Sequence, residues 1–350
     1  MDLNKIVVPK FNNDLYEKIL RNWDALAKPI DGLGEFEKVL SRIGAVQGSE
    51  NIDLEHAALT VFISDNGVIE EGVSQSDEEV TYQVACALGK GTSTVCHMAK
   101  AAGADVFPVN VGMKRTADVL GVTNYSVSYG TKNFVKEDAM TYDEMISAIE
   151  AGFRVVEDLS DKGYKVLLLG EMGIGNTTTS AAVLASILSL PAEKVCSRGA
   201  GLSDVGLHKK VCAVNAGVER CHECDGDALE ILRKVGGLDI AALTGAIISA
   251  CLHNIAIISD GFITATAALI ASRLMPEIKD YVIFSHNGRE KGIAPILDEF
   301  GAKPVIDADM ALGEGTGACV FLSAAKTALS VYSGNTRFDD INIDSYKRFN

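Results

Sequence analysis

Six short apolar runs, rich in β-branched residues, recur through the middle of the chain. Each is continuous rather than alternating, which is typical of strands buried on both faces of a parallel sheet. They are LTVFIS (59–64), DVFPVNVG (105–112), KVLLLG (165–170), IAIISD (255–260), YVIFSH (281–286) and PVIDAD (304–309). Segments with helical periodicity separate them. This alternation predicts an α/β protein with a Rossmann-like parallel sheet of about six strands flanked by helices.

The two ends of the chain lack such runs. DLYEKILRNWDAL near the start and GACVFLSAAKTALSVYSG near the end place apolar residues at helical spacing instead. We therefore expect residues 1–45 and 320–350 to form a small helical domain together. Residues 46–319 form the large α/β domain in this division.

Composition and charge narrow the classes of partner. Hydrophobic residues make up 47% of the 350 positions, and 32 Lys and Arg against 47 Asp and Glu leave a net charge of −15. An acidic surface repels phosphate backbones and anionic lipid, so we expect neither nucleic-acid nor membrane binding. The sequence shows no secretory signal and no run of about 18 apolar residues. Together with eight scattered cysteines, among them a lone C-x-x-C at Cys221 and Cys224, this indicates a cytoplasmic protein with reduced thiols.

Polar or glycine-containing loops follow all six predicted strands, where ligands bind in open parallel sheets. In VLLLGEMGIGNTTTSAAV (166–183), Gly170, Gly175 and Thr177 have P-loop spacing, but Asn176 replaces the P-loop lysine. Its loss argues against nucleoside triphosphate hydrolysis. A glycine-rich turn at a helix start still suits a single phosphate. The alternative is a tight turn that binds nothing.

Two further loops offer charged groups for chemistry. SRGAGLSDVGLHKK (197–210) brings Arg198, Lys209 and Lys210 to a second glycine-rich segment, although lysines that open a helix are often simply solvated. In LGEGTGA (312–318), Glu314 between glycines is placed to accept a proton, or merely to interact with a helix dipole. Asp65 and Asp260 end strands, where aspartate often caps the next helix.

Together these loops resemble the nicotinate-nucleotide–dimethylbenzimidazole phosphoribosyltransferase family over nearly the whole chain. The matching stretches, in family order, are SDNGVIEEGVS, GEMGIGNTTTSAA, KVGGLDIAALTGAI, SDGFITATAALIA and LGEGTGA. The resemblance implies transfer of the phosphoribosyl group of nicotinate mononucleotide to a lower-ligand base, dimethylbenzimidazole or a related one. The products are an α-ribotide and nicotinate, and the step belongs to cobamide nucleotide-loop assembly. The resemblance also implies homodimers. The reaction that it implies requires no cofactor and no metal.

The same resemblance implies roles for individual residues. The family's catalytic base falls on Glu314. Positions that hold the phosphate and ribose of the ribotide fall on Glu171, Gly173, Asn176, Thr177, Gly201 and Lys210. The pocket for the base, or its rim, is expected at Asp65, Ser74, Ser285, Asn287 and Leu312.

Three segments depart from the usual family pattern. LAKPIDGLG (26–34) replaces L-x-K-P-P-G-S-L-G, DNGV (65–68) replaces D-H-G-V, and SHNGRE (285–290) replaces S-H-x-S-A-E. These changes leave the acceptor open between a substituted benzimidazole, a purine and a phenol. They also leave open a hetero-oligomer with a paralogue. The sequence also allows two other functions. One is an inactive partner subunit that binds the ribotide, and the other is a nucleotide-sensing relative of P-loop proteins.

Overall fold

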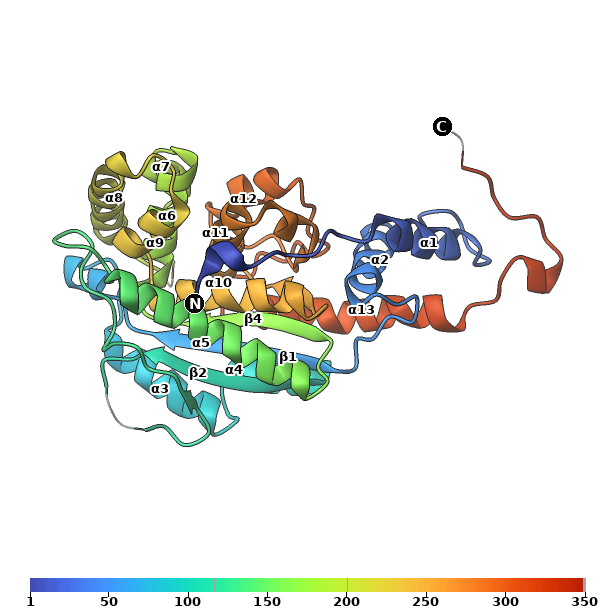
Figure 1. Cartoon of the computed structure of the whole chain (residues 1–350), viewed down its shortest axis with the longest axis horizontal. Helices are drawn as coiled ribbons and strands as arrows, with labels where there is room; N and C mark the ends of the chain where they lie inside the picture. The colour runs from blue at the N-terminus through green and yellow to red at the C-terminus, as the bar shows by residue number, and fades with distance from the viewer. Residues whose placement is uncertain (116–117, 200, 349–350) are drawn as a thin grey trace.

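A six-stranded parallel sheet, in the order β3-β2-β1-β4-β5-β6, forms the centre of the molecule (Figure 1). The computed structural model describes residues 1–115, 118–199 and 201–348. The strands are β1 (Ala57–Ser64), β2 (Ala104–Gly112), β3 (Thr123–Asn124), β4 (Val166–Met172), β5 (Ala256–Ser259) and β6 (Val282–Phe284). Every residue of β1 and β4 is buried, which explains why these strands appear in the sequence as unbroken apolar runs.

The predicted α/β class and the strand number are confirmed, but one predicted strand is wrong. Residues 304–309 are not a strand: they make one isolated bridge, between Ile306 and His286. Only Val305 and Ile306 in this stretch are large and apolar, and both are only partly buried, so it has little to place in a core. The sixth strand is β3, at the opposite edge, and its two exposed residues are too few to produce a recognisable pattern.

Helices cover both faces of the sheet. On one face, α10 (Leu238–Leu252) lies across β1, β2, β4 and β5 and packs against α5 (Tyr142–Asp161). The two helix backbones touch at glycines, because a Cβ atom on Gly152 would overlap the Ala242 carbonyl, and one on Gly245 that of Ile149. On the other face, α4 (Thr94–Ala102) packs against β2 and α13 (Thr316–Gly334) against β4.

The other helices of the large domain pack against the sheet or against one another. In Figure 1, α6 to α9 form one group and α11 and α12 another. The bounds are α3 (Glu78–Gly89), α6 (Asn176–Leu188), α7 (Ala192–Val195), α8 (Asp204–Arg220), α9 (Ala228–Val235), α11 (Phe262–Leu274) and α12 (Ile293–Phe300). Short 3-10 helices cover Leu3–Lys5, Gly67–Glu71, His222–Cys224, Pro276–Asp280 and Asp339–Ile341.

The two ends of the chain meet in a projection that we call the terminal arm, formed by α1 (Asn13–Asp24), α2 (Glu35–Gln47) and the distal part of α13 (Figure 1). Trp23 of α1 packs against Tyr332 of α13 with ring centroids 4.7 Å apart, and the Ala27 amide donates to the Thr336 carbonyl at 2.8 Å. Because α13 begins beside the sheet and continues into the arm, a division at residue 319 falls inside one helix.

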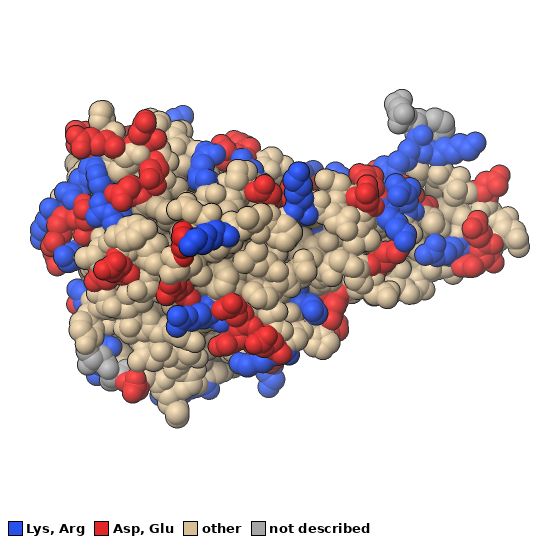
Figure 2. Space-filling view, in the orientation of Figure 1, with Lys and Arg blue, Asp and Glu red and all other residues tan. Residues whose placement is uncertain are grey.

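The surface carries charges of both signs. Figure 2 shows basic and acidic side chains intermixed on the visible face, and pairs such as Arg220 with Asp138 (2.6 Å) place them in contact. Within residues 1–115, 118–199 and 201–348, no helix has both the length and the apolar character that a bilayer crossing requires.

Candidate active site

A pocket opens beyond the carboxyl ends of β4, β5 and β6. Its wall consists of residues 171–177, 260–263, 286, 288–290 and 310–314, together with Val73, Ser74 and Gly199. This is the edge at which open parallel sheets bind ligands. Of the six loops expected there, the two that follow β1 and β2, at residues 65–67 and 112–114, do not line the pocket.

Glu314 enters the pocket from an unusual stretch of backbone. Gly313, Glu314 and Gly315 all have positive φ, at +89°, +61° and +99°. This region is natural for glycine but strained for glutamate, and such strain persists only where surrounding contacts enforce it. The Oε2 atom of Glu314 is buried and has no hydrogen-bond partner among the described residues. A carboxylate in this state is a strong candidate proton acceptor.

Asp260, directly after β5, holds the segment that carries Glu314. Its Oδ2 accepts the amide of Gly315 at 3.1 Å and its Oδ1 that of Ala318 at 3.0 Å. We expected Asp260 to cap the next helix, but it caps the start of α13, more than 50 residues later. Burial raises the pKa of Asp260, against the opposing effect of His286. Burial also raises the pKa of Glu314, and the nearby Asp260 carboxylate raises it further.

At the floor of the pocket, one amide group joins an acid of the wall to an acid buried behind it. Asn176, the first residue of α6, donates from Nδ2 to Glu171 Oε2 and to Asp239 Oδ2, the latter at 3.2 Å. Burial, reinforced by the Asp239 carboxylate, raises the pKa of Glu171 well above its usual value. Gly173 lies beside them, where a Cβ atom would overlap the Ser64 carbonyl.

A buried lysine lies behind the part of the pocket wall that Thr177 and Gly199 form, and it is not itself a wall residue. Lys210 is 1% exposed, and its ammonium donates to the hydroxyl of Thr177 at 2.8 Å, beside Gly199. Burial lowers its pKa, while the charge of Glu290 opposes this. Its neighbour Lys209 is exposed, and Arg198 bonds to Asp204 and the Leu202 carbonyl. Of the three candidate cations, Lys210 is therefore the one that faces the glycine-rich loop.

The remaining predicted site residues divide between the pocket and its surroundings. Ser74 and Leu312 line it. The Gly201 carbonyl lies outside and accepts from Gln75. Ser285 is buried behind the wall, where its hydroxyl donates to the Asp260 carbonyl at 2.9 Å.

Two expected rim residues face elsewhere. The amide of Asn287 donates to the Ile306 carbonyl at 2.8 Å, and its exposed side chain is not part of the wall. Asp65 is buried after β1 and accepts the Lys114 amide at 2.8 Å. The structure therefore does not bring Asp65, Ser285, Asn287, Gly201 or Lys210 into the pocket wall, although Lys210 contacts the wall residue Thr177.

The sequence did not point to Asp239, and it gave no role to His286. The side chain of His286 is buried and lines the pocket. The available signal for Asp239 was a lone acid at the second position of a long apolar helix that follows two glycines. His286 follows β6, and its ring reaches Gly317 of α13, where a Cβ atom would overlap it.

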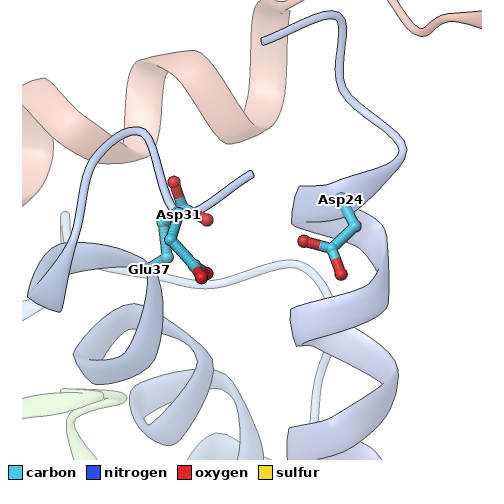
Figure 3. Close-up of side chains that lie close together, drawn as sticks. All are labelled: Asp24, Asp31 and Glu37. Carbon is cyan, nitrogen blue, oxygen red and sulfur yellow. The ribbon is translucent and has the colours of Figure 1, made fainter. Parts of the chain in front are cut away.

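The acidic group most suited to a metal ion, among the residues that the structure describes, lies in the terminal arm and not in the pocket. It comprises Asp24, Asp31 and Glu37 (Figure 3). Arg348 bonds to Asp24 and Asp31 at 2.7–2.9 Å, and Lys28 bonds to Glu37 at 2.7 Å. These cations already compensate the three carboxylates, as in an ordinary ion-pair network.

Comparison with known proteins gives a consistent result. A family model described as "Phosphoribosyltransferase" matches residues 8–343. A nicotinate-nucleotide–dimethylbenzimidazole phosphoribosyltransferase of Acetivibrio thermocellus is 38% identical over 331 residues, covering 95% of this chain and 94% of the relative. One from Geobacter sp. is 34% identical, covering 92% and 93%. The crystal structure of CobT from Thermus thermophilus superposes with a TM-score of 0.89 at 33% identity, covering 95% of this chain and 99% of that one.

Proposed function

Since the chain belongs to the nicotinate-nucleotide–dimethylbenzimidazole phosphoribosyltransferase family and is a phosphoribosyltransferase, we propose that its pocket binds nicotinate mononucleotide between Lys210 and Glu314. Lys210 and Thr177 anchor the phosphate, Glu171 and Asn176 face the ribose, and Glu314 accepts the proton of the incoming base. The product is an α-ribotide for the nucleotide loop of a cobamide.

The phosphate end supplies local positive potential in an acidic protein. The ammonium of Lys210 and the N-terminus of α6 converge at Thr177. A helix N-terminus favours an anion, and a buried ammonium whose partner among the described residues is one hydroxyl has two donors to spare there. A bound phosphate would accept from both and compensate the buried charge.

The reaction needs one proton acceptor near the anomeric carbon. A ring nitrogen of the base attacks C1′ of the ribose while the bond from C1′ to the pyridinium nitrogen breaks. The bonding electrons stay on that nitrogen, so nicotinate leaves without being protonated. The N–H proton of the attacking base passes to Glu314, and attack opposite the leaving group converts the β to the α configuration. No pyrophosphate departs, so the proposal includes neither a metal nor a cofactor.

The acceptor end of the pocket suits a flat apolar base. The wall that Glu314 shares includes five apolar side chains, Val73, Ile174, Phe262, Met310 and Leu312. Apolar side chains gain little from the ring nitrogens and amino group of a purine, whereas they bury the methyl groups of dimethylbenzimidazole favourably. We therefore propose a substituted benzimidazole as the preferred acceptor.

The observation that carries this proposal is the buried Oε2 of Glu314, which has no hydrogen-bond partner among the described residues, in a pocket whose wall residue Thr177 is bonded to Lys210. The test is incubation of the purified chain with nicotinate mononucleotide and dimethylbenzimidazole, adenine or phenol, followed by mass analysis. We expect a ribotide and free nicotinate, formed fastest with dimethylbenzimidazole. No ribotide with any acceptor would refute the proposal and favour a binding subunit without activity.

We extend the proposal to assembly and location. Exposed Ile341, Ile343 and Tyr346 near the terminal arm offer apolar surface to a second copy, which supports a homodimer. Sedimentation of the purified chain distinguishes a homodimer from a monomer that needs a paralogue. All eight cysteines are free thiols, which favours the reducing cytoplasm.

A further inference from the structure

Asp239 is a buried acid at the start of an otherwise apolar helix. It is the only charged residue of α10, and its side chain is 0% exposed. Burying a carboxylate is strongly unfavourable unless hydrogen bonds or a cation compensate it. Its presence in this helix therefore requires an explanation from its contacts.

Both oxygens of Asp239 accept hydrogen bonds. Oδ1 accepts the amide of Ile240 at 3.0 Å, and Oδ2 accepts Nδ2 of Asn176 at 3.2 Å. The same nitrogen donates to Glu171 Oε2. A side-chain amide has two N–H donors, so two carboxylates use both of them. The amide cannot turn over without directing its carbonyl oxygen at the acids, and its orientation is therefore fixed.

The surrounding backbone fits closely around this carboxylate. A Cβ atom on Gly173 would lie 3.3 Å from Asp239 Oδ2, and one on Gly237 would overlap Oδ1. The loop after β4 thus lies close to Oδ2, and the turn before α10 lies close to Oδ1. Gly173 also lines the pocket, so Asp239 lies directly behind the pocket wall.

The polar groups around Asp239 are acids and amides. Glu171 faces it from β4, Asp65 and Asn66 from the end of β1, and Asn176 from α6. Asn66 is neutral and 0% exposed, and it stands where the family pattern has histidine. Burial raises the pKa of Asp239 to about 6, with a smaller contribution from Asp65, while the Asn176 bond opposes the rise. Asn176 is therefore the side chain that stabilises this carboxylate.

The contacts continue from Asp239 to the loop that carries Glu314. Glu171 receives the Asn176 amide on Oε2, while its Oε1 faces Gly313, where a Cβ atom would lie 2.8 Å away. Gly313 directly precedes Glu314. Displacing Asn176 would thus release Glu171 and change the pocket wall beside Glu314, the candidate proton acceptor.

We propose that Asp239 is a positioning residue for phosphoribosyl transfer, which holds the Asn176 amide, and through it the Glu171 carboxyl group, in the orientation that the ribose of the donor requires. This inference rests on the proposed function, because it takes Asn176 and Glu171 as donor-binding residues. Asp239 itself lies behind the wall and acts only through Asn176.

The test is a double-mutant cycle of Asp239→Asn and Asn176→Ala, with the affinity for nicotinate mononucleotide measured by calorimetry. Asparagine keeps the size of Asp239 but offers one acceptor oxygen to two N–H donors. We expect Asp239→Asn to weaken binding about tenfold alone and less than twofold in the Asn176→Ala background, since contacting residues are not additive. Equal weakening in both backgrounds, or none in either, would overturn the proposal.

Two further variants separate positioning from folding. Glu37→Gln alters an equally buried acid, 1% exposed, at the first turn of α2 in the terminal arm, and should change thermal unfolding but not affinity. Asp239→Ser, which removes the buried charge and the reach to Asn176, should repeat the effect of Asp239→Asn and replaces it if that variant does not fold. Failure of the unaltered chain to bind the nucleotide would refute the proposed function, whereas intact binding without coupling would refute the role of Asp239 alone.

Discussion

Gly170, in β4, lies directly against the backbone of Glu314. A Cβ atom on Gly170 would overlap the carbonyl oxygen of Glu314 and stand 2.7 Å from its carbonyl carbon. The sequence suggested that Gly170 is the first glycine of a phosphate loop. The structure gives it a different purpose, since only glycine at this point of the strand allows the strained turn with Glu314 to approach.

Gly170→Ala should therefore displace Glu314 without removing any functional group. A shift of about 1 Å in a reacting group can lower turnover about 100-fold, so we expect kcat to fall by 10- to 100-fold with the affinity for nicotinate mononucleotide little changed. Steady-state kinetics and calorimetry measure the two effects. The control is Gly334→Ala at the end of α13, where nothing lies within 4 Å of the added methyl group. Unchanged kcat in Gly170→Ala would contradict the placement of the base.

Lys210→Met should weaken binding of the phosphorylated donor far more than it slows the chemistry. Methionine preserves the length of the buried chain but removes the ammonium that reaches Thr177. Loss of a charge-assisted bond to phosphate is worth roughly 1.5–3 kcal/mol, so we expect KM for nicotinate mononucleotide to rise by ten- to about 100-fold. The exposed neighbour supplies the control, because Lys209→Met should leave KM within twofold. If the two variants behave alike, the phosphate binds elsewhere.

The pH dependence of turnover should report the carboxyl group of Glu314. A base works only when deprotonated, and burial together with Asp260 raises the pKa of Glu314 above its ordinary 4.5. Activity is therefore full above the raised pKa and falls as the pH drops through it, at a higher pH than for an exposed glutamate. Profiles of kcat that extend from neutral pH into the acid range would show this acid limb.

Glu314→Gln is the companion measurement. It should lose most of kcat, retain nicotinate mononucleotide binding, and leave a residual rate without the acid limb. An acid limb that persists unchanged in this variant would assign the titration to a different group, such as the buried Glu171.

The sequence was sufficient to predict those parts of the fold in which burial leaves a local pattern. β1, β2, β4, β5 and β6 are buried along most of their length, so each produced a continuous apolar run. β3 lies at an exposed edge and has two residues, which leave no pattern. PVIDAD combined Val305 and Ile306 with turn-forming residues, and periodicity alone could not distinguish this from a short strand.

In the pocket, the glycine-rich spacing located Asn176, Thr177 and Glu314, because loop geometry is encoded by neighbouring residues. The spacing could not reveal which distant residues form hydrogen bonds with these loops. Asp260 binds Gly315 from 55 positions away and Asp239 binds Asn176 from 63 positions away. Such contacts depend on how the strands are ordered in the sheet, so no local spacing indicates them.

Asp260→Asn should change both the start of α13 and the titration of Glu314. Asn offers one acceptor oxygen to the amides of Gly315 and Ala318, which should lower the free energy of unfolding by about 1 kcal/mol. Removing the negative charge also removes a cause of the raised pKa of Glu314, so the acid limb of kcat should move to lower pH. Urea unfolding and pH–rate profiles measure the two changes.

The matched control for Asp260 is Asp227, which caps α9 by accepting the amides of Leu229 at 2.9 Å and Glu230 at 3.2 Å. Asp227→Asn weakens a helix cap of the same kind, but away from the pocket wall, so it should destabilise the fold without moving the acid limb. If both variants shift the limb equally, the shift reflects general loosening of the structure. If only Asp260→Asn shifts it, the carboxylate of Asp260 sets the pH range in which Glu314 can accept a proton.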